Sequence, residues 1–120
     1  MHTLAAGVAA MIRVDSAWLA TEPLDMRAGM DTVLARVIAV FGAAEPHHAY
    51  VFANRRATRM KVLVHDGIGL WLAARRLHRG KFVWAAPGDS TWPLQSEQLQ
   101  ALVLGLPWQR MGSDGAITVV

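Results

Sequence analysis

Apolar side chains recur at helical spacing in one long stretch of the chain. Asp25 precedes this stretch as a candidate N-cap, because its carboxylate can accept hydrogen bonds from the first free N–H groups of a helix. Gly42 follows the stretch as a C-terminal stop. We therefore expect a helix over 26–41, with Gly29 in its first turn marking the close approach of another segment. The positions on its apolar face are Met26, Met30, Leu34, Val37, Ile38 and Phe41.

The segment that follows has the character of strands: 49–53 is aromatic and β-branched, 69–77 is apolar, and 60–65 and 81–84 alternate with the period of two that strands show. Turn signals at 66–69 and 79–80 divide this segment. The pattern predicts an antiparallel meander of about four strands, over 49–53, 60–65, 69–77 and 81–84. Residues 70–77 also have the composition of a short helix, but their glycine-bounded length of about eight residues favours a strand. An earlier short strand is expected over 12–20.

A second, shorter helix is expected near the end of the chain, over 96–104. Gln95 is its candidate cap, and Leu94 and Leu99 have the spacing of a hydrophobic staple. The stretch 85–93 is rich in Pro, Gly, Asp and Ser, which predicts a loop. The fold class that results is α+β: an antiparallel sheet meander of about four strands packed with two helices.

Length and composition indicate one domain. The chain has 120 residues, of which 53% are apolar and 18% charged, so it can form a single hydrophobic core. We expect a flexible N-terminal extension (1–10), one domain (11–110) and a flexible tail (111–120). Met11 is an alternative start of translation. Residues 1–12 lack the positive charge that precedes the apolar region of a secretory signal, and no apolar run reaches the ~18 residues of a membrane span, so we expect a cytoplasmic location without membrane contact.

The basic residues are concentrated in one segment. Eight of the 12 Lys and Arg residues lie within 55–81, where Asp66 is the single acid, so this segment carries +7 and the rest of the chain −4. In an antiparallel meander, the segment's two loops and strand ends meet at one end of the sheet, with Asp66 at the other. Ten of the 12 basic residues are arginines, which suit bidentate contact with phosphate. The predicted nucleic-acid-binding residues are Arg55, Arg56, Arg59, Lys61, Arg75, Arg76, Arg79 and Lys81.

Two other interpretations of this charge stay open: an acidic protein partner, and a solvated rim without a ligand. The high apolar content also leaves open a buried contact with a partner or with a second copy of the chain.

Other chemistry receives less support from the sequence. The absence of cysteine excludes disulfides, thiol nucleophiles and Cys-based metal sites. Aspartates could form a metal site, but each has a structural explanation: Asp25 caps a helix, Asp31 pairs with Arg27 one helical turn away, and Asp66 shapes a turn. The histidines lack ligand spacing and the serines lack a nucleophile elbow. Four tryptophans are expected to be core or interface anchors rather than base-stacking platforms: Trp71, Trp84, Trp92 and Trp108.

Several blocks of sequence resemble one family of bacterial mobile-element proteins. Residues 25–31 (DMRAGMD) resemble its DMRxGxD motif, and 61–72 (KVLVHDGIGLWL) resemble its KVLxxDGxGxxL segment. Residues 75–84 (RRLHRGKFVW) are similar to its RRLxxGxFxW block, and Leu94, Leu99 and 105–108 match its last helix and end motif. Over about 12–110, the chain thus resembles the TnpB accessory proteins of insertion sequences of the sixty-six type, which are distinct from the RNA-guided nucleases of that name. It departs from the pattern in its later Pro87 and in lacking a Thr-Pro cap on the last helix.

The resemblance implies an auxiliary factor for transposition. Its implied partners are a separate transposase, which carries the acidic catalytic triad, and a second small helix-turn-helix accessory protein. No catalytic residue carries over, and we expect no enzymatic activity, cofactor or metal. We therefore expect a non-catalytic accessory factor that binds DNA phosphates through an Arg-rich end of the sheet. The alternative is a protein–protein adaptor that docks on an acidic surface of the transposase without binding DNA.

Overall fold

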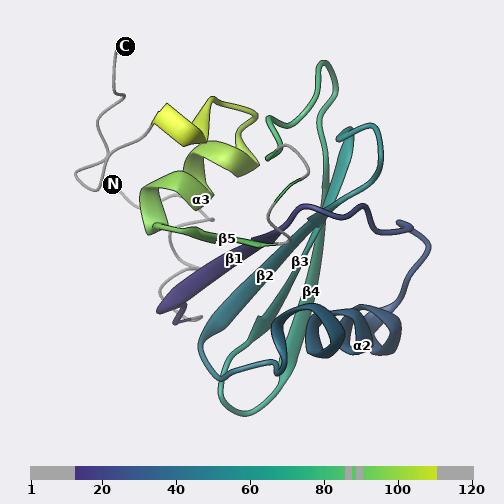
Figure 1. The fold of residues 1–120 in the computed structure, drawn as a ribbon, viewed down its shortest axis with the longest axis vertical. Helices are drawn as coiled ribbons and strands as arrows, with labels where there is room; N and C mark the ends of the chain where they lie inside the picture. Colours follow the sequence, from purple (N-terminus) through teal and green to yellow (C-terminus); the bar gives the residue numbers. More distant parts are fainter. Residues whose placement is uncertain (1–12, 86–87, 89–90, 111–120) are drawn as a thin grey trace.

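The fold is a five-stranded mixed sheet with one helix on each face (Figure 1). The computed structural model describes residues 13–85, 88 and 91–110, so the expected extension (1–10) and tail (111–120) lie outside the described residues. The α+β prediction is confirmed. In chain order the elements are β1 (Ser16–Ala20), α2 (Met30–Phe41), β2 (His48–Ala53), β3 (Arg59–His65), β4 (Leu70–Arg76), β5 (Thr91–Leu94), α3 (Ser96–Val103) and the 3-10 helix η1 (Trp108–Arg110).

The strand order is β4-β3-β2-β1-β5, and the sheet is not purely antiparallel. The predicted meander is right for β2, β3 and β4, including the choice of strand over helix for residues 70–76. However, β1 pairs with β2 in the parallel direction. Parallel neighbours need a long crossover connection, and α2 supplies it by carrying the chain back along the sheet.

The last strand was predicted in the wrong place. Residues 81–84 form no strand, because their polar groups bind other segments: the Phe82 N–H donates to Ala57 O at 2.8 Å, and the Trp84 indole donates to Ala20 O at 2.9 Å. The strand β5 instead begins inside the expected loop (85–93), extends one residue beyond it and pairs antiparallel with β1. Pro93 is compatible with this position because β5 is an edge strand.

Helix α2 begins four residues later than predicted. Asp25 is not its cap, because the Asp25 carboxylate binds the Arg27 N–H (2.9 Å) and the Arg27 guanidinium (2.7 Å) within a turn. The expected Arg27–Asp31 ion pair is therefore wrong. Gly29 occupies the N-cap position, and a Cβ placed there would meet no heavy atom within 4 Å, so the expected close approach is also wrong. The predicted end at Gly42 is confirmed, with φ at +90°.

Each helix covers one face of the sheet and defines one core. Helix α2 buries Val33 and Val37 against Tyr50 and other large side chains on one face. Helix α3 and η1 bury Leu102 and Trp108 against the other face, around Val51. Because both faces are covered, β2 is buried along almost its whole length.

Helix α3 agrees with its predicted position to within one residue. The Gln98 side chain accepts the Gln95 N–H at 2.8 Å, so Gln95 caps the helix despite its low intrinsic preference. No helix in the described ranges is long and apolar enough to cross a membrane.

A serine at position 29 should stabilise the protein. The N-cap backbone is extended (φ −87°, ψ −173°) and the space around it is open, so Gly29→Ser adds a hydrogen-bond acceptor without a clash. We expect the free energy of unfolding in urea to rise by a few tenths of a kcal/mol. The matched control Gly42→Ser should lower it by about 1 kcal/mol, because position 42 has a positive φ. A loss of stability in Gly29→Ser would contradict the open N-cap.

Candidate nucleic-acid interface

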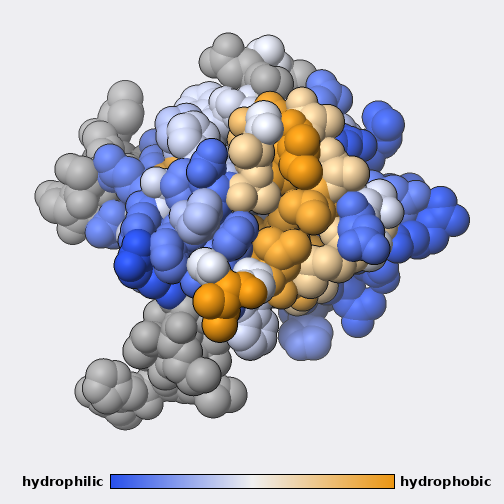
Figure 2. Space-filling view, turned by 90° about the horizontal axis from the view of Figure 1, so that it is seen from below, coloured by the Kyte–Doolittle hydropathy of each residue, from blue (hydrophilic) through white to orange (hydrophobic). Residues whose placement is uncertain are grey.

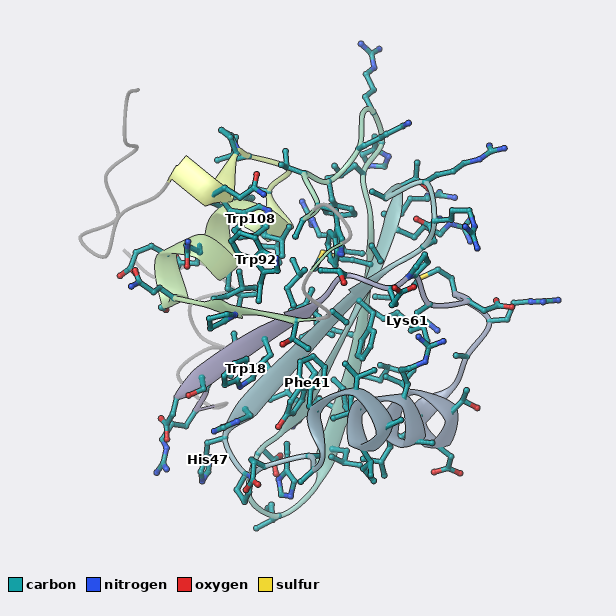
Figure 3. The ribbon with its side chains drawn as sticks, in the orientation of Figure 1. Trp18, Phe41, His47, Lys61, Trp92 and Trp108 are labelled. Atoms are coloured by element: carbon teal, nitrogen blue, oxygen red, sulfur yellow. The ribbon has the colours of Figure 1, made fainter. Side chains whose placement is uncertain are left out.

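The predicted site residues all belong to one end of the sheet. β2 ends there, β3 begins there, and β4 ends there, so the loops 54–58 and 77–81 project side by side (Figure 1). We call this the basic end. In Figure 3, long side chains tipped with nitrogen project from it. Asp66 belongs to the turn between β3 and β4, at the opposite end of these strands.

The loop 54–58, which carries Arg55 and Arg56, is held by the side chain of Asn54. The Asn54 Oδ1 accepts the backbone N–H groups of Thr58 (2.9 Å) and Arg59 (3.1 Å), and its Nδ2 donates to the Thr58 hydroxyl (2.9 Å). These three bonds fix the backbone of the loop. Its two arginines are thus mounted on a rigid base although both side chains are exposed.

The two basic loops are joined to each other. Ala57 adopts a left-handed backbone conformation (φ 55°), which aims its carbonyl at the N–H of Phe82. Phe82 is 3% exposed, so it anchors the loop 77–81 in the core next to this hydrogen bond. The arginines of one loop are therefore fixed relative to the cations of the other.

Two arginines face each other directly across the β3–β4 ladder. Arg59 is the register partner of Arg76, and cross-strand partners lie on the same face of a sheet. Both residues are exposed. In the described part of the chain the ion pairs are Arg13–Asp15 and Arg27–Asp25, so none of the eight predicted cations is neutralised by a carboxylate.

Two of the eight cations also hold the helices. The Lys61 Nζ donates to Ala28 O at 2.6 Å, just before α2 (Figure 3). The Arg75 Nε donates to Val103 O at 2.6 Å, at the end of α3. Because positions 61 and 75 lie on opposite faces of the sheet, the basic end is tied to both helices.

The surface at this end is hollowed in two places. A depression of about 480 Å³ is lined by Arg55, Arg56 and Arg59 together with Asp25. A second, of about 360 Å³, is lined by Arg59, Lys61, Arg75 and Arg76. Arg59 and Met26 line both, so the two depressions adjoin each other and carry arginines on both sides of the boundary.

Sequence reasoning missed the turn that borders this surface. The Asp25 carboxylate lines the first depression and is ion-paired with Arg27, whose side chain is 92% exposed. Side-chain and backbone hydrogen bonds from Arg27 lower the pKa of Asp25 from its ordinary 3.8 to about 2. The signal was present in the Asp-Met-Arg motif, but it was interpreted as a helix start.

The aspartates considered for a metal site are not brought together. Asp66 accepts the N–H groups of Ile68 (2.9 Å) and Gly69 (2.7 Å) and the Trp71 indole N–H (2.7 Å), and these bonds lower its pKa. Its predicted role in the turn is confirmed. Among residues 13–85, 88 and 91–110, no group of three or more His, Asp or Glu side chains is arranged to hold a metal ion.

The tryptophans divide between core and surface. Trp108 is fully buried, and its indole donates to Val83 O. Trp92 packs edge-on against it, with ring centroids 5.8 Å apart (Figure 3). Trp71 is half-exposed, but its N–H is held by Asp66. Packing and hydrogen bonds within the protein therefore explain the positions of these three side chains, and no stacking on a nucleic-acid base is needed to explain them.

The comparisons with known proteins identify the class. The family model described as "IS66 Orf2 like protein" (TnpB_IS66) matches residues 15–113. The chain belongs to this family, whose members are accessory proteins of IS66-type transposition.

Two uncharacterized proteins of Sinorhizobium fredii are similar to it. One, y4jC, is 33% identical over 95 residues, covering 78% of this chain and 80% of the relative. The other, y4hO, is 33% identical over 93 residues, covering 77% and 81%. No solved structure matches the chain significantly.

The Asp25–Arg27 pair predicts an unusual titration. We expect the Asp25 carboxyl to titrate near pH 2 in a carbon-detected NMR experiment, and to return toward 3.8 in Arg27→Gln. Because the folded pKa is below the unfolded one, the pair's stabilising effect is complete above the unfolded pKa and disappears as the pH falls from about 4 to about 2. An unchanged Asp25 midpoint in Arg27→Gln would show that Arg27 is not the cause.

Proposed function

We propose that this chain is a non-catalytic accessory factor for DNA transposition that binds DNA phosphates at the basic end and acts with a separate transposase. The family supplies the link to transposition. The contact with DNA is inferred from the charges and hydrogen bonds of the basic end.

The observation that carries the proposal is the cross-strand pairing of two exposed arginines, Arg59 and Arg76, neither of which forms an ion pair in the described structure. Like charges placed directly opposite each other in a sheet are destabilising, and in the described structure neither Arg59 nor Arg76 forms an ion pair, the nearby Asp25 being paired with Arg27. An external anion at this position would remove the repulsion. A phosphate is well matched because guanidinium groups bind it with two parallel hydrogen bonds each.

The rigidity of the basic end supports the same function. Asn54 fixes the first loop, and the Ala57–Phe82 hydrogen bond fixes the second loop against it. Binding then costs less conformational entropy in the backbone that carries the arginines. In the described part of the chain the eight cations lie on strands and loops rather than on a helix that could enter a groove, so we propose contact that is mainly with phosphates and largely independent of sequence.

Removing the Arg59–Arg76 contact should weaken DNA binding and its salt dependence together. In fluorescence anisotropy with labelled duplex and single-stranded DNA, the double variant Arg59→Gln/Arg76→Gln should bind all sequences more weakly. The slope of log affinity against log salt should fall by about 2, one for each lost phosphate contact. The charge-matched control Arg13→Gln/Arg36→Gln removes two arginines outside the basic end and should keep the wild-type slope. No cleavage of either DNA is expected during incubation with Mg²⁺ or Mn²⁺.

Absence of binding at low salt would contradict this proposal. If the wild type then binds purified transposase, and Arg59→Gln/Arg76→Gln does not, the adaptor interpretation replaces it. Equal loss of DNA binding in the two double variants would also count against a specific basic end, since it would show a response to net charge alone.

The same double variant should be more stable than the wild type. Relief of the cross-strand repulsion should raise the free energy of unfolding by ~0.2–1 kcal/mol at low salt. The gain should shrink as salt screens the charges. Urea denaturation at two salt concentrations measures it. A variant that loses both stability and DNA binding would contradict the interpretation, because the arginines would then be structural.

A further inference from the structure

The end of the molecule opposite the basic end carries a hydrophobic groove. Seen from below in Figure 2, a band of hydrophobic residues crosses this end between two hydrophilic regions. A depression of about 540 Å³ lies between α2 and the β3–β4 turn. The apolar side chains that line it are Leu34, Ile38, Ala43, Ala44, Ile68 and Leu70.

Ile68 is a rigid apolar projection at the edge of this groove. Its side chain is 98% exposed, at a turn position where polar residues or glycine are usual. The turn is held by the Asp66 carboxylate, which accepts three N–H groups, and by His65 Nδ1, which accepts the Gly67 N–H at 3.0 Å. An exposed isoleucine held in place beside an exposed apolar groove marks an interaction surface.

We propose that this surface is the interface of a homodimer. An isologous interface requires one patch that is complementary to itself. Here each copy has a projection and a groove side by side, so a two-fold axis can place Ile68 of each protomer against Leu34 and Ile38 of the other. The two-fold symmetry makes this contact twice, once in each direction between the protomers. Ile38, whose side chain is 49% exposed in one copy, becomes covered.

The distribution of charge favours a second copy at this surface. The lining of the groove contains His65 but no Asp, Glu, Lys or Arg, and the neighbouring Asp66 carboxylate is bound by three N–H groups of its own turn, so two copies bring no carboxylate, ammonium or guanidinium group of the lining together. The basic ends point away from each other, each separated from the interface along the longest dimension of the molecule, 39 Å. Electrostatic screening acts over about 10 Å at 0.1 M salt, so their repulsion does not oppose the dimer. Pairing through the open β4 edge would instead place Arg75 and Arg76 of both copies in one ladder.

Sedimentation equilibrium of the full chain tests the proposal. From low to several hundred micromolar, the wild-type mass should rise toward twice the 13.1 kDa of one chain. Ile68→Asp and Ile38→Asp should each raise the dissociation constant about tenfold or more, with unchanged circular dichroism. The control Leu106→Asp alters a 46% exposed leucine near α3 and should leave the dissociation constant unchanged. A monomeric wild type, a dimer insensitive to both isoleucine variants, or equal loss in the control would overturn the proposal.

A mixing experiment tests the contact itself. Ile68→Lys and Ile38→Glu should each be mainly monomeric, whereas their mixture should form a heterodimer detectable by native mass spectrometry. In that heterodimer the introduced lysine meets the introduced glutamate at one contact, and the two native isoleucines meet at the other. Failure of the mixture to associate, with a dimeric wild type, would overturn the pairing of Ile68 with Ile38. None of these measurements involves DNA, so their outcome is independent of the proposed function.

Discussion

Parallel pairing of β1 with β2 is the constraint on which the arrangement of the molecule depends. Because the two strands run in the same direction, the chain must return along the sheet between them, and α2 makes that return. The ends of β1 and β2 therefore lie at one end of the sheet, whereas α2 lies toward the other (Figure 1). The antiparallel strands β3 and β4 then bring the Arg-rich loops to the end where β1 and β2 finish and the Asp66 turn to the other. One pairing thus separates a charged end from an apolar end.

Hydrogen bonds made by a few polar groups convert this arrangement into a fixed surface. Without Asn54 and the Ala57–Phe82 bond, the basic loops would be two independent flexible segments. Lys61 and Arg75 use one donor each to hold the segments next to α2 and α3. They therefore serve the packing of the helices as well as the charge of the surface, and their loss would have mixed effects. The side chains of Arg59 and Arg76 have no such contact in the described structure. Their substitution should therefore change ligand binding without disturbing the packing of the helices.

Local patterns in the sequence predicted the elements whose stability is local. Aromatic and β-branched residues identified β2, the period of two identified β3, the glycine-bounded length identified β4, and glycine marked the end of α2. The start of α2 was missed because Asp25 has two competing uses, as a helix cap and as a partner of Arg27, and the ion pair prevails. β5 was missed because its four residues include a proline and its partner, β1, lies far away in the sequence.

In the candidate site, too, the features that depend on the local sequence were predictable and those that depend on pairing between distant segments were not. Counting charges was enough to find the eight basic residues, since clustering along the chain survives in any antiparallel arrangement. The opposition of Arg59 and Arg76 depends on the strand register, which a shift of one residue would abolish. The apolar groove joins α2 to a turn more than twenty positions away, so neither segment alone indicates it.

The pairing of β5 with β1 has a consequence for synthesis on the ribosome. Ala17 pairs with Leu94, so β1 keeps an open edge until β5, more than seventy positions later, has been made. The face around Leu19 and Val51 also stays uncovered until α3 and Trp108 follow. A nascent or prematurely terminated chain therefore exposes both an unpaired strand edge and an apolar face, the two features that promote aggregation and attract chaperones and proteases. Only chains translated past Trp108 can bury them, which gives the cell a physical means of removing shorter copies.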